Sequence, residues 1–151
     1  MCALTDWPAR YGLPARTIRN IVPISGLFDL EPVSLTFMQP DLRISDRDIA
    51  EASPQRLIAP VPVRMLITYG SDESSEFYRH SEDFRAGWEA AGNRAAFFPQ
   101  LGRNHFTAIT DLGDPQAPLT RAILDLMEHR PRPARGAGGI DTRLFPRRAG
   151  R

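Results

Sequence analysis

Two short segments of the chain carry side chains that could transfer protons. The turn Gly70-Ser71-Asp72-Glu73 follows an apolar run, and the segment Gly102-Arg103-Asn104-His105-Phe106 comes about 30 residues later in the chain. In a hydrolytic triad, a carboxylate fixes the tautomer of an imidazole, and the imidazole takes a proton from a serine hydroxyl. An acid followed by a histidine is the order expected when the serine comes earlier in the chain.

Each segment also has a simpler interpretation. A histidine in a loop is more often structural or solvated, and an Asp-Glu pair after a strand often forms a turn and the start of a helix. The two segments gain weight together, because both are expected at the ends of successive strands, where functional groups gather in an open α/β sheet. We therefore predict that His105 transfers protons and that Asp72 or Glu73 is its acid.

The elements that would position these residues follow from the apolar pattern. A continuous apolar run is typical of a buried parallel strand, and an i, i+4, i+7 spacing is typical of one helix face. Ser45 is a plausible N-cap for the first helix, and Ser74 or Ser75 for the second. The predicted order is strand 18–27, a turn-rich region 28–41, helix 46–51, strand 61–69, helix 75–91, strand 95–98 closed by Pro99, and a helix from 119 to 127.

Alternation of this kind predicts an α/β fold with a parallel sheet and flanking helices. The helix after residue 74 should bury one face, formed by Phe77, Ser81, Phe84, Trp88 and Ala91. Three strands make a thin sheet, and the first would present an apolar edge. We therefore expect an incomplete sheet, which sequence missing on the N-terminal side would complete.

Four stretches together resemble the kynurenine formamidase (arylformamidase) branch of the α/β-hydrolases, and related esterases more loosely. The resemblance covers roughly residues 5–127 and implies the C-terminal half of an α/β-hydrolase fold acting on an ester or an aryl formamide. It matches His105 to the catalytic histidine and Glu73 to the catalytic acid, with Asp72 as the alternative acid. The stretches are Ser25-Gly26-Leu27-Phe28-Asp29-Leu30-Glu31-Pro32, Ser53-Pro54, residues 69–77, and residues 102–106.

The chain departs from this family at the nucleophile. A G-x-S-x-G elbow, which carries the serine between strand and helix, occurs nowhere in the 151 residues. Ser25 precedes Gly26, but Pro23 stands in place of the first glycine and no helix is expected to follow. The resemblance places the elbow and the oxyanion loop upstream of Met1. We therefore expect a fragment that is inactive alone and uses no cofactor and no metal.

Composition narrows the class of protein. No apolar run is long enough to span a bilayer, and the first residues resemble no signal peptide, which predicts a cytoplasmic protein without membrane contact. The lone Cys2 excludes an internal disulfide and a cysteine-rich metal site. The expected partners are a small-molecule substrate and either a second copy of the chain or the missing N-terminal half.

Charge separates residues 1–129, the expected hydrolase portion, from residues 130–151. The second segment holds seven arginines and one aspartate, a net charge of +6. Because the whole chain has a net charge of +1, residues 1–129 carry a net charge of −5. Its Arg, Pro and Gly content predicts a disordered tail. Nucleic-acid binding is the weakest hypothesis, because the acidic body offers no basic face. The stronger alternative to catalysis is an interaction module that pairs with a partner chain through the open sheet edge.

Overall fold

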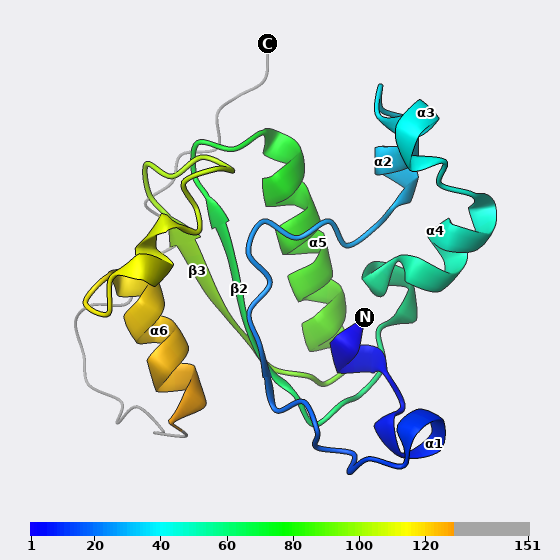
Figure 1. Cartoon of the computed structure of the whole chain (residues 1–151), viewed down its shortest axis with the longest axis horizontal. Helices are drawn as coiled ribbons and strands as arrows, with labels where there is room; N and C mark the ends of the chain where they lie inside the picture. The colour runs from blue at the N-terminus through cyan, green and yellow to red at the C-terminus, as the bar shows by residue number, and fades with distance from the viewer. Residues whose placement is uncertain (129–151) are drawn as a thin grey trace.

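A three-stranded parallel sheet forms the centre of the molecule (Figure 1). The computed structural model describes residues 1–128. The strands are β1 (Asn20–Ile21), β2 (Arg64–Gly70) and β3 (Ala95–Gln100), and they lie in the order β1-β2-β3. The prediction of an α/β fold with an open parallel sheet is confirmed for the described residues.

Helices surround the sheet, and two of them position the candidate site. Helix α5 (Ser75–Ala90) and helix α6 (Pro118–Met127) lie on opposite sides of the strands (Figure 1). The shorter α-helices are α1 (Trp7–Tyr11), α2 (Glu31–Ser34), α3 (Gln39–Leu42) and α4 (Asp46–Ala52), and 3-10 helices span Cys2–Leu4, Pro54–Leu57 and Thr110–Gly113. None of the helices in residues 1–128 combines the length and the apolar character that crossing a bilayer requires.

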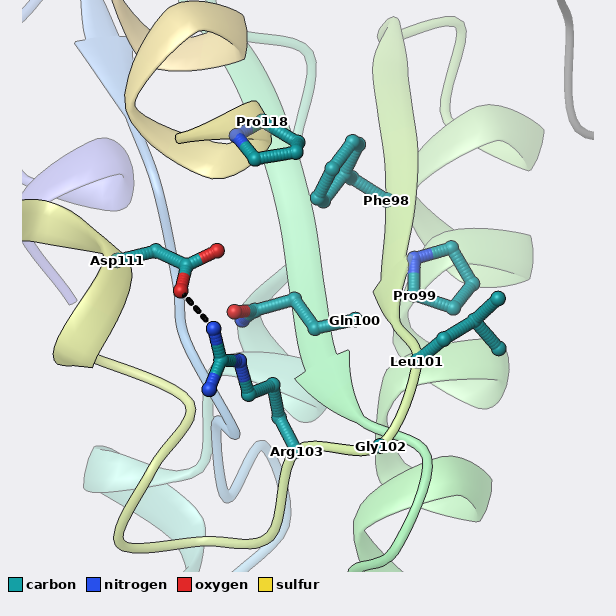
Figure 2. A pocket seen from close by; sticks show the side chains of 8 residues that line it. All are labelled: Phe98, Pro99, Gln100, Leu101, Gly102, Arg103, Asp111 and Pro118. Carbon is teal, nitrogen blue, oxygen red and sulfur yellow. Dashed lines mark hydrogen bonds and ion pairs between the residues drawn. The ribbon is translucent and has the colours of Figure 1, made fainter. Parts of the chain in front are cut away.

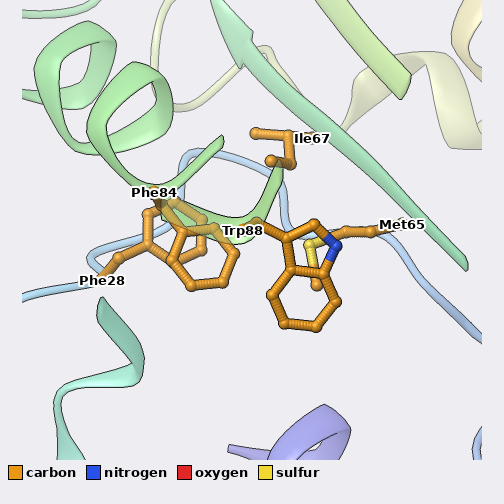
Figure 3. Close-up of a cluster of buried hydrophobic side chains, with 5 residues drawn as sticks. All are labelled: Phe28, Met65, Ile67, Phe84 and Trp88. Atoms are coloured by element: carbon orange, nitrogen blue, oxygen red, sulfur yellow. The ribbon is translucent and has the colours of Figure 1, made fainter. Parts of the chain in front are cut away.

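Aromatic side chains fill the space between β2 and α5. Trp88 and Ile67 are fully buried, and the rings of Phe28 and Phe84 stack with centroids 4.1 Å apart (Figure 3). Such a ring pair stabilises a core by about 1 kcal/mol beyond the apolar area that it buries. Of the predicted helix face, Ser81, Phe84 and Trp88 are buried, whereas Phe77 is only half-buried.

The first strand is shorter than predicted, because Pro23 interrupts it. The register Ile21↔Met65 continues without a slip to the isolated pair Ile24↔Thr68, and the carbonyl of Pro23 accepts a hydrogen bond from the Thr68 N–H at 3.1 Å. Pro23 therefore faces β2, but it has no N–H to donate there. The missing hydrogen bond reduces the regular strand to two residues while the chain stays extended beside β2.

The third strand is longer than predicted and runs through Pro99, which pairs in register with Tyr69. Gln100 accepts a hydrogen bond from the Ser71 N–H at 2.9 Å, so its backbone faces β2. Successive residues of a strand direct their backbone groups to opposite sides, so Pro99 directs its nitrogen to the side of β3 that pairs with no strand of residues 1–128. The expectation that Pro99 closes the strand was wrong, because a proline is tolerated where no partner strand needs its N–H.

The segment between β1 and β2 contains more structure than predicted. Residues 28–41 were expected to be turns, yet they include α2 and part of α3. Helix α4 is confirmed with its cap, because Ser45 and Asp48 form a reciprocal capping box. Ser74 is the N-cap residue of α5, but its side chain makes no capping hydrogen bond. The predicted tail at 130–151 lies outside the described residues.

Candidate active site

The acid candidate Glu73 is held at the end of β2. The turn after Gly70 brings the Glu73 side chain back to the strand, where Oε1 accepts a hydrogen bond from the Gly70 N–H at 2.9 Å. The hydroxyl of Ser25 donates a second hydrogen bond to the same oxygen. Only 1% of the Glu73 side chain is exposed. A carboxylate that is removed from water needs such donors, so the site is built to hold a charged or hydrogen-bonded acid.

The histidine candidate lies in the loop after β3, and backbone hydrogen bonds join this loop to the acid turn. The Asp72 N–H donates to the Arg103 carbonyl at 2.9 Å, and the Gly102 N–H donates to the Ser71 hydroxyl at 2.8 Å. The Asn104 side chain then accepts hydrogen bonds from the N–H groups of Phe106 and Thr107, both at 3.0 Å. Two strand-end loops are thereby fixed against each other.

The two candidates meet across these loops. The Nδ1 atom of His105 lies 3.3 Å from Oε2 of Glu73. The imidazole stacks on the Phe77 ring at 4.6 Å between centroids, and 52% of the His105 side chain is exposed. A neutral ring that donates Nδ1–H to Glu73 has a free lone pair on Nε2, the arrangement that a general base requires.

Asp72, the alternative acid, makes no hydrogen bond or ion pair with the histidine among the described residues. It is exposed and accepts a hydrogen bond from the neighbouring Ser71 hydroxyl at 3.0 Å. The structure therefore brings Glu73 and His105 together and leaves Asp72 apart, while the catalytic role of either carboxylate stays a prediction.

The two carboxylates can be separated by isosteric variants. We expect Glu73→Gln to lower hydrolysis by on the order of 10³-fold or more in an extended protein that supplies the nucleophile, because an amide cannot hold the imidazole in the required tautomer and charge state. Asp72→Asn should change the rate by less than about threefold, since the side chain makes only an exposed contact. Steady-state kinetics measures both variants, and the reverse order of effects would move the acid to Asp72.

The sequence did not indicate that Ser25 and Phe77 contact the acid–histidine pair. Ser25 was considered in the search for a nucleophile and Phe77 as part of a core face, and both lie in stretches that resemble the formamidases, but neither was expected to contact the pair. The structure places the Ser25 hydroxyl against Glu73 and the Phe77 ring under His105. The Ser25-Gly26 pair at the end of an apolar run was the available signal, because small residues at strand ends often mark unusual backbone conformations.

A second histidine, His80, is buried in the core. Its Nδ1 accepts a hydrogen bond from the Phe28 N–H at 3.3 Å, and the residue is 3% exposed. Burial, with a smaller contribution from the Arg79 guanidinium, holds the pKa of His80 below its usual value, against the opposing effects of Glu76, Asp29 and Asp83. The folded protein therefore favours the neutral ring, and its stability should fall as the pH drops below the ordinary histidine value of 6.5.

This pH dependence can be assigned to His80 by substitution. An asparagine can accept the Phe28 hydrogen bond and does not titrate, so we expect His80→Asn to lose less stability than the wild type between pH 7.5 and pH 5. Urea unfolding at both pH values measures the difference. An equal loss in the two proteins would mean that other groups cause the acid sensitivity.

A hollow of about 370 Å³ lies beside this site on the α6 side of β3 (Figure 2). The Arg103–Asp111 ion pair crosses one side of it, and the buried Gln100 side chain reaches into it with Oε1 unpaired (Figure 2). Neither Glu73 nor His105 lines this hollow.

The chain is similar in sequence to known proteins over most of its described length. No family model matches the chain. It is 26% identical over 132 residues to a kynurenine formamidase of Danio rerio and 25% identical over 133 residues to one of Salmo salar. Each match covers 84% of this chain, but only 44% and 45% of those proteins. The chain thus spans less than half the length of the curated relatives that it matches.

Solved structures of similar fold are also matched over less than half of their length. A crystal structure of a putative thioesterase from Silicibacter sp. TM1040 superposes with a TM-score of 0.66 at 24% identity, covering 78% of this chain and 43% of that one. Carboxyl esterase 2 from Tuber melanosporum superposes with a TM-score of 0.51 at 23% identity, covering 83% and 46%. At these identities the likeness establishes the fold alone.

The parallel sheet, its order and the two strand-end loops define the C-terminal half of an α/β-hydrolase fold. Within that class, the sequence is similar to kynurenine formamidases, and the structure to esterases and a putative thioesterase. The resemblance expected from the sequence is confirmed at this level.

Proposed function

We propose that this chain supplies the acid and the histidine of a serine-hydrolase site that cleaves an ester or an aryl formamide. The observation that carries the proposal is the contact between Glu73 Oε2 and His105 Nδ1, with the acid buried and half of the His105 side chain exposed. The similarity to kynurenine formamidases supports the formamide as one substrate class, and the likeness to esterases supports the ester.

The chemistry follows from the roles of the two side chains. Nε2 of His105 takes the proton of a serine hydroxyl as the oxygen attacks the carbonyl carbon, and Glu73 stabilises the imidazolium that forms. The imidazolium then donates this proton to the departing alcohol or amine. In the second half-reaction His105 takes a proton from water as the water attacks the acyl carbon, and it returns the proton to the serine oxygen as the carboxylic acid leaves.

The nucleophile in this proposal comes from outside residues 1–151. The chain contains no G-x-S-x-G elbow, and the Ser25 hydroxyl contacts Glu73 rather than the imidazole. A histidine and a carboxylate alone lack both the attacking oxygen and the donors that stabilise the oxyanion. We therefore expect negligible hydrolysis by residues 1–151 when they are produced alone.

The test compares residues 1–151 with an extended protein, defined as these residues joined to the segment encoded in frame directly upstream of Met1. We expect an elbow serine in that segment, hydrolysis of p-nitrophenyl acetate or N-formylkynurenine, and labelling of the serine by a fluorophosphonate. Residues 1–151 alone should show neither. An extended protein that folds but neither hydrolyses these substrates nor reacts with the probe would contradict the proposal.

A non-catalytic interaction module is the second candidate function. It is favoured by exposed apolar side chains near the carboxyl ends of the strands and in the segment after β1. Phe37 is 91% exposed, Phe106 84% and Leu35 83%. Surfaces of this kind commonly mark contacts with another chain. A stable oligomer of residues 1–151, together with an inactive extended protein, would support this alternative.

A further inference from the structure

Ser25 occupies an unusual place between β1 and the acid turn. Its N–H donates to the Thr68 carbonyl at 2.8 Å, so its backbone is fixed to β2. Its hydroxyl donates to Oε1 of Glu73, a residue 48 positions later in the chain. The residue is only 8% exposed. Ser25 is therefore the structural link between the end of the first strand and the acid.

The backbone conformation of Ser25 indicates that its side chain does more than fill space in the core. Its φ is +51°, in the left-handed region that favours glycine and disfavours residues with a Cβ. A glycine would relax this conformation but would have no hydroxyl. Strain of this kind persists where the surrounding structure requires the side chain, and it gathers at functional sites. The described contact that requires the Ser25 side chain is its hydrogen bond to Glu73.

The hydrogen bonds of Glu73 show what this contact does. The Gly70 N–H and the Ser25 hydroxyl both bind Oε1, while Oε2 lies 3.3 Å from His105 Nδ1. Two donors from different segments fix one oxygen and thereby direct the other toward the imidazole. With the Gly70 donor alone, the carboxylate could rotate about its terminal bond, and its alignment with Nδ1 would no longer be enforced.

We propose that Ser25 is a positioning residue that orients the Glu73 carboxylate toward His105. This inference deepens the proposed function and rests on it for its catalytic meaning, because an aligned acid selects the Nδ1–H tautomer of the histidine. Ser25 acts through Glu73 and contacts no reacting atom. This role also accounts for a buried serine beside the acid that is not aimed at the histidine.

The tautomer of His105 gives a readout that needs no catalysis. Residues 1–151, labelled with ¹⁵N at histidine, are measured by NMR at a pH high enough for the imidazole to be neutral. In the wild type, we expect the His105 Nδ1 resonance in the region of protonated ring nitrogens. In Ser25→Ala and Ser25→Gly, it should move toward the region of unprotonated nitrogens, because an imidazole in water prefers the Nε2–H form.

Two further variants, and the fold of Ser25→Gly, separate an effect on orientation from an effect on structure. Ser25→Asn should restore part of the Nδ1–H form, since asparagine tolerates positive φ and its amide can donate to Glu73. Ser34→Ala, which removes a serine hydroxyl that donates to the Glu31 carbonyl, should leave the His105 spectrum unchanged. Ser25→Gly relieves the backbone strain, so its fold should persist even if Ser25→Ala fails to fold.

The outcomes distinguish this inference from the proposed function. The positioning role would be overturned if the His105 chemical shifts of Ser25→Ala and Ser25→Gly both equalled those of the wild type. A changed spectrum in Glu73→Gln would show that the acid–histidine pair nevertheless exists. Loss of the Nδ1–H form in Ser25→Gly, with recovery in Ser25→Asn, would support it. Hydrolysis by the extended protein is measured separately, so a failure of the proposed function does not alter the NMR result.

Discussion

His105→Ala is expected to lower ester or formamide hydrolysis by the extended protein by on the order of 10⁴-fold or more. The variant removes the base that takes the serine proton, and no other described side chain lies against the Glu73 carboxylate in a position to replace the imidazole. Because half of the His105 side chain is exposed, the fold should lose little stability. The change should therefore appear in kcat, with the unfolding midpoint nearly unchanged.

His80→Asn is the matched control for this variant. It replaces another histidine of the described chain, but one that lies in the core and contacts the Phe28 backbone. We expect kcat within about threefold of the wild type at neutral pH, because His80 makes no contact with Glu73 or His105. Near-normal turnover by His105→Ala, measured with the same substrate, would remove His105 from the mechanism.

Gly70→Ala should be the most destabilising small substitution at the site. A Cβ at this position would lie 2.1 Å from the Arg103 carbonyl oxygen and 2.6 Å from its carbon. Both atoms belong to the backbone of the histidine loop, so no side-chain rotation can relieve the clash. We expect a loss of about 3 kcal/mol in the free energy of unfolding, the upper part of the range for overpacked positions. Urea unfolding of residues 1–151 measures it.

The same substitution should also separate the acid from the histidine. Relief of the clash requires the Arg103 segment to move away from the end of β2, and His105 follows two residues later. Gly113→Ala is the control, because a Cβ there meets no atom within 4 Å. It should change stability by less than about 0.5 kcal/mol, as expected for a surface position. Equal stabilities for the two variants would disprove the predicted close approach at Gly70.

The elements that bury apolar side chains could be predicted from the sequence. The run Met65 to Tyr69 and the spacing of Phe84 and Trp88 depend on local patterns, and both segments form as expected. The strand ends could not be predicted in the same way. Whether a proline stops a strand depends on whether its nitrogen faces a partner strand, and tertiary structure alone decides this for Pro23 and Pro99.

The titratable residues of the candidate site could be predicted from the sequence, but the residues that hold them in place could not. Glu73 and His105 could be proposed from residue type, order and family resemblance, and the structure brings them within 3.3 Å. Residue type and order left Asp72 and Glu73 open, because adjacent residues in a turn differ mainly in direction. The contacts of Ser25 and Phe77 span 48 and 28 residues, and no local pattern encodes an approach of this range.

Pro99 has a consequence for how copies of this chain can associate. The sheet of the described residues has two free sides, and addition of β1 of one copy to β3 of the next would generate an endless filament. Pro99 removes a donor from the β3 side, which makes that side a poor template for strand addition. Among residues 1–128, strand addition is therefore less favourable at β3 than at β1.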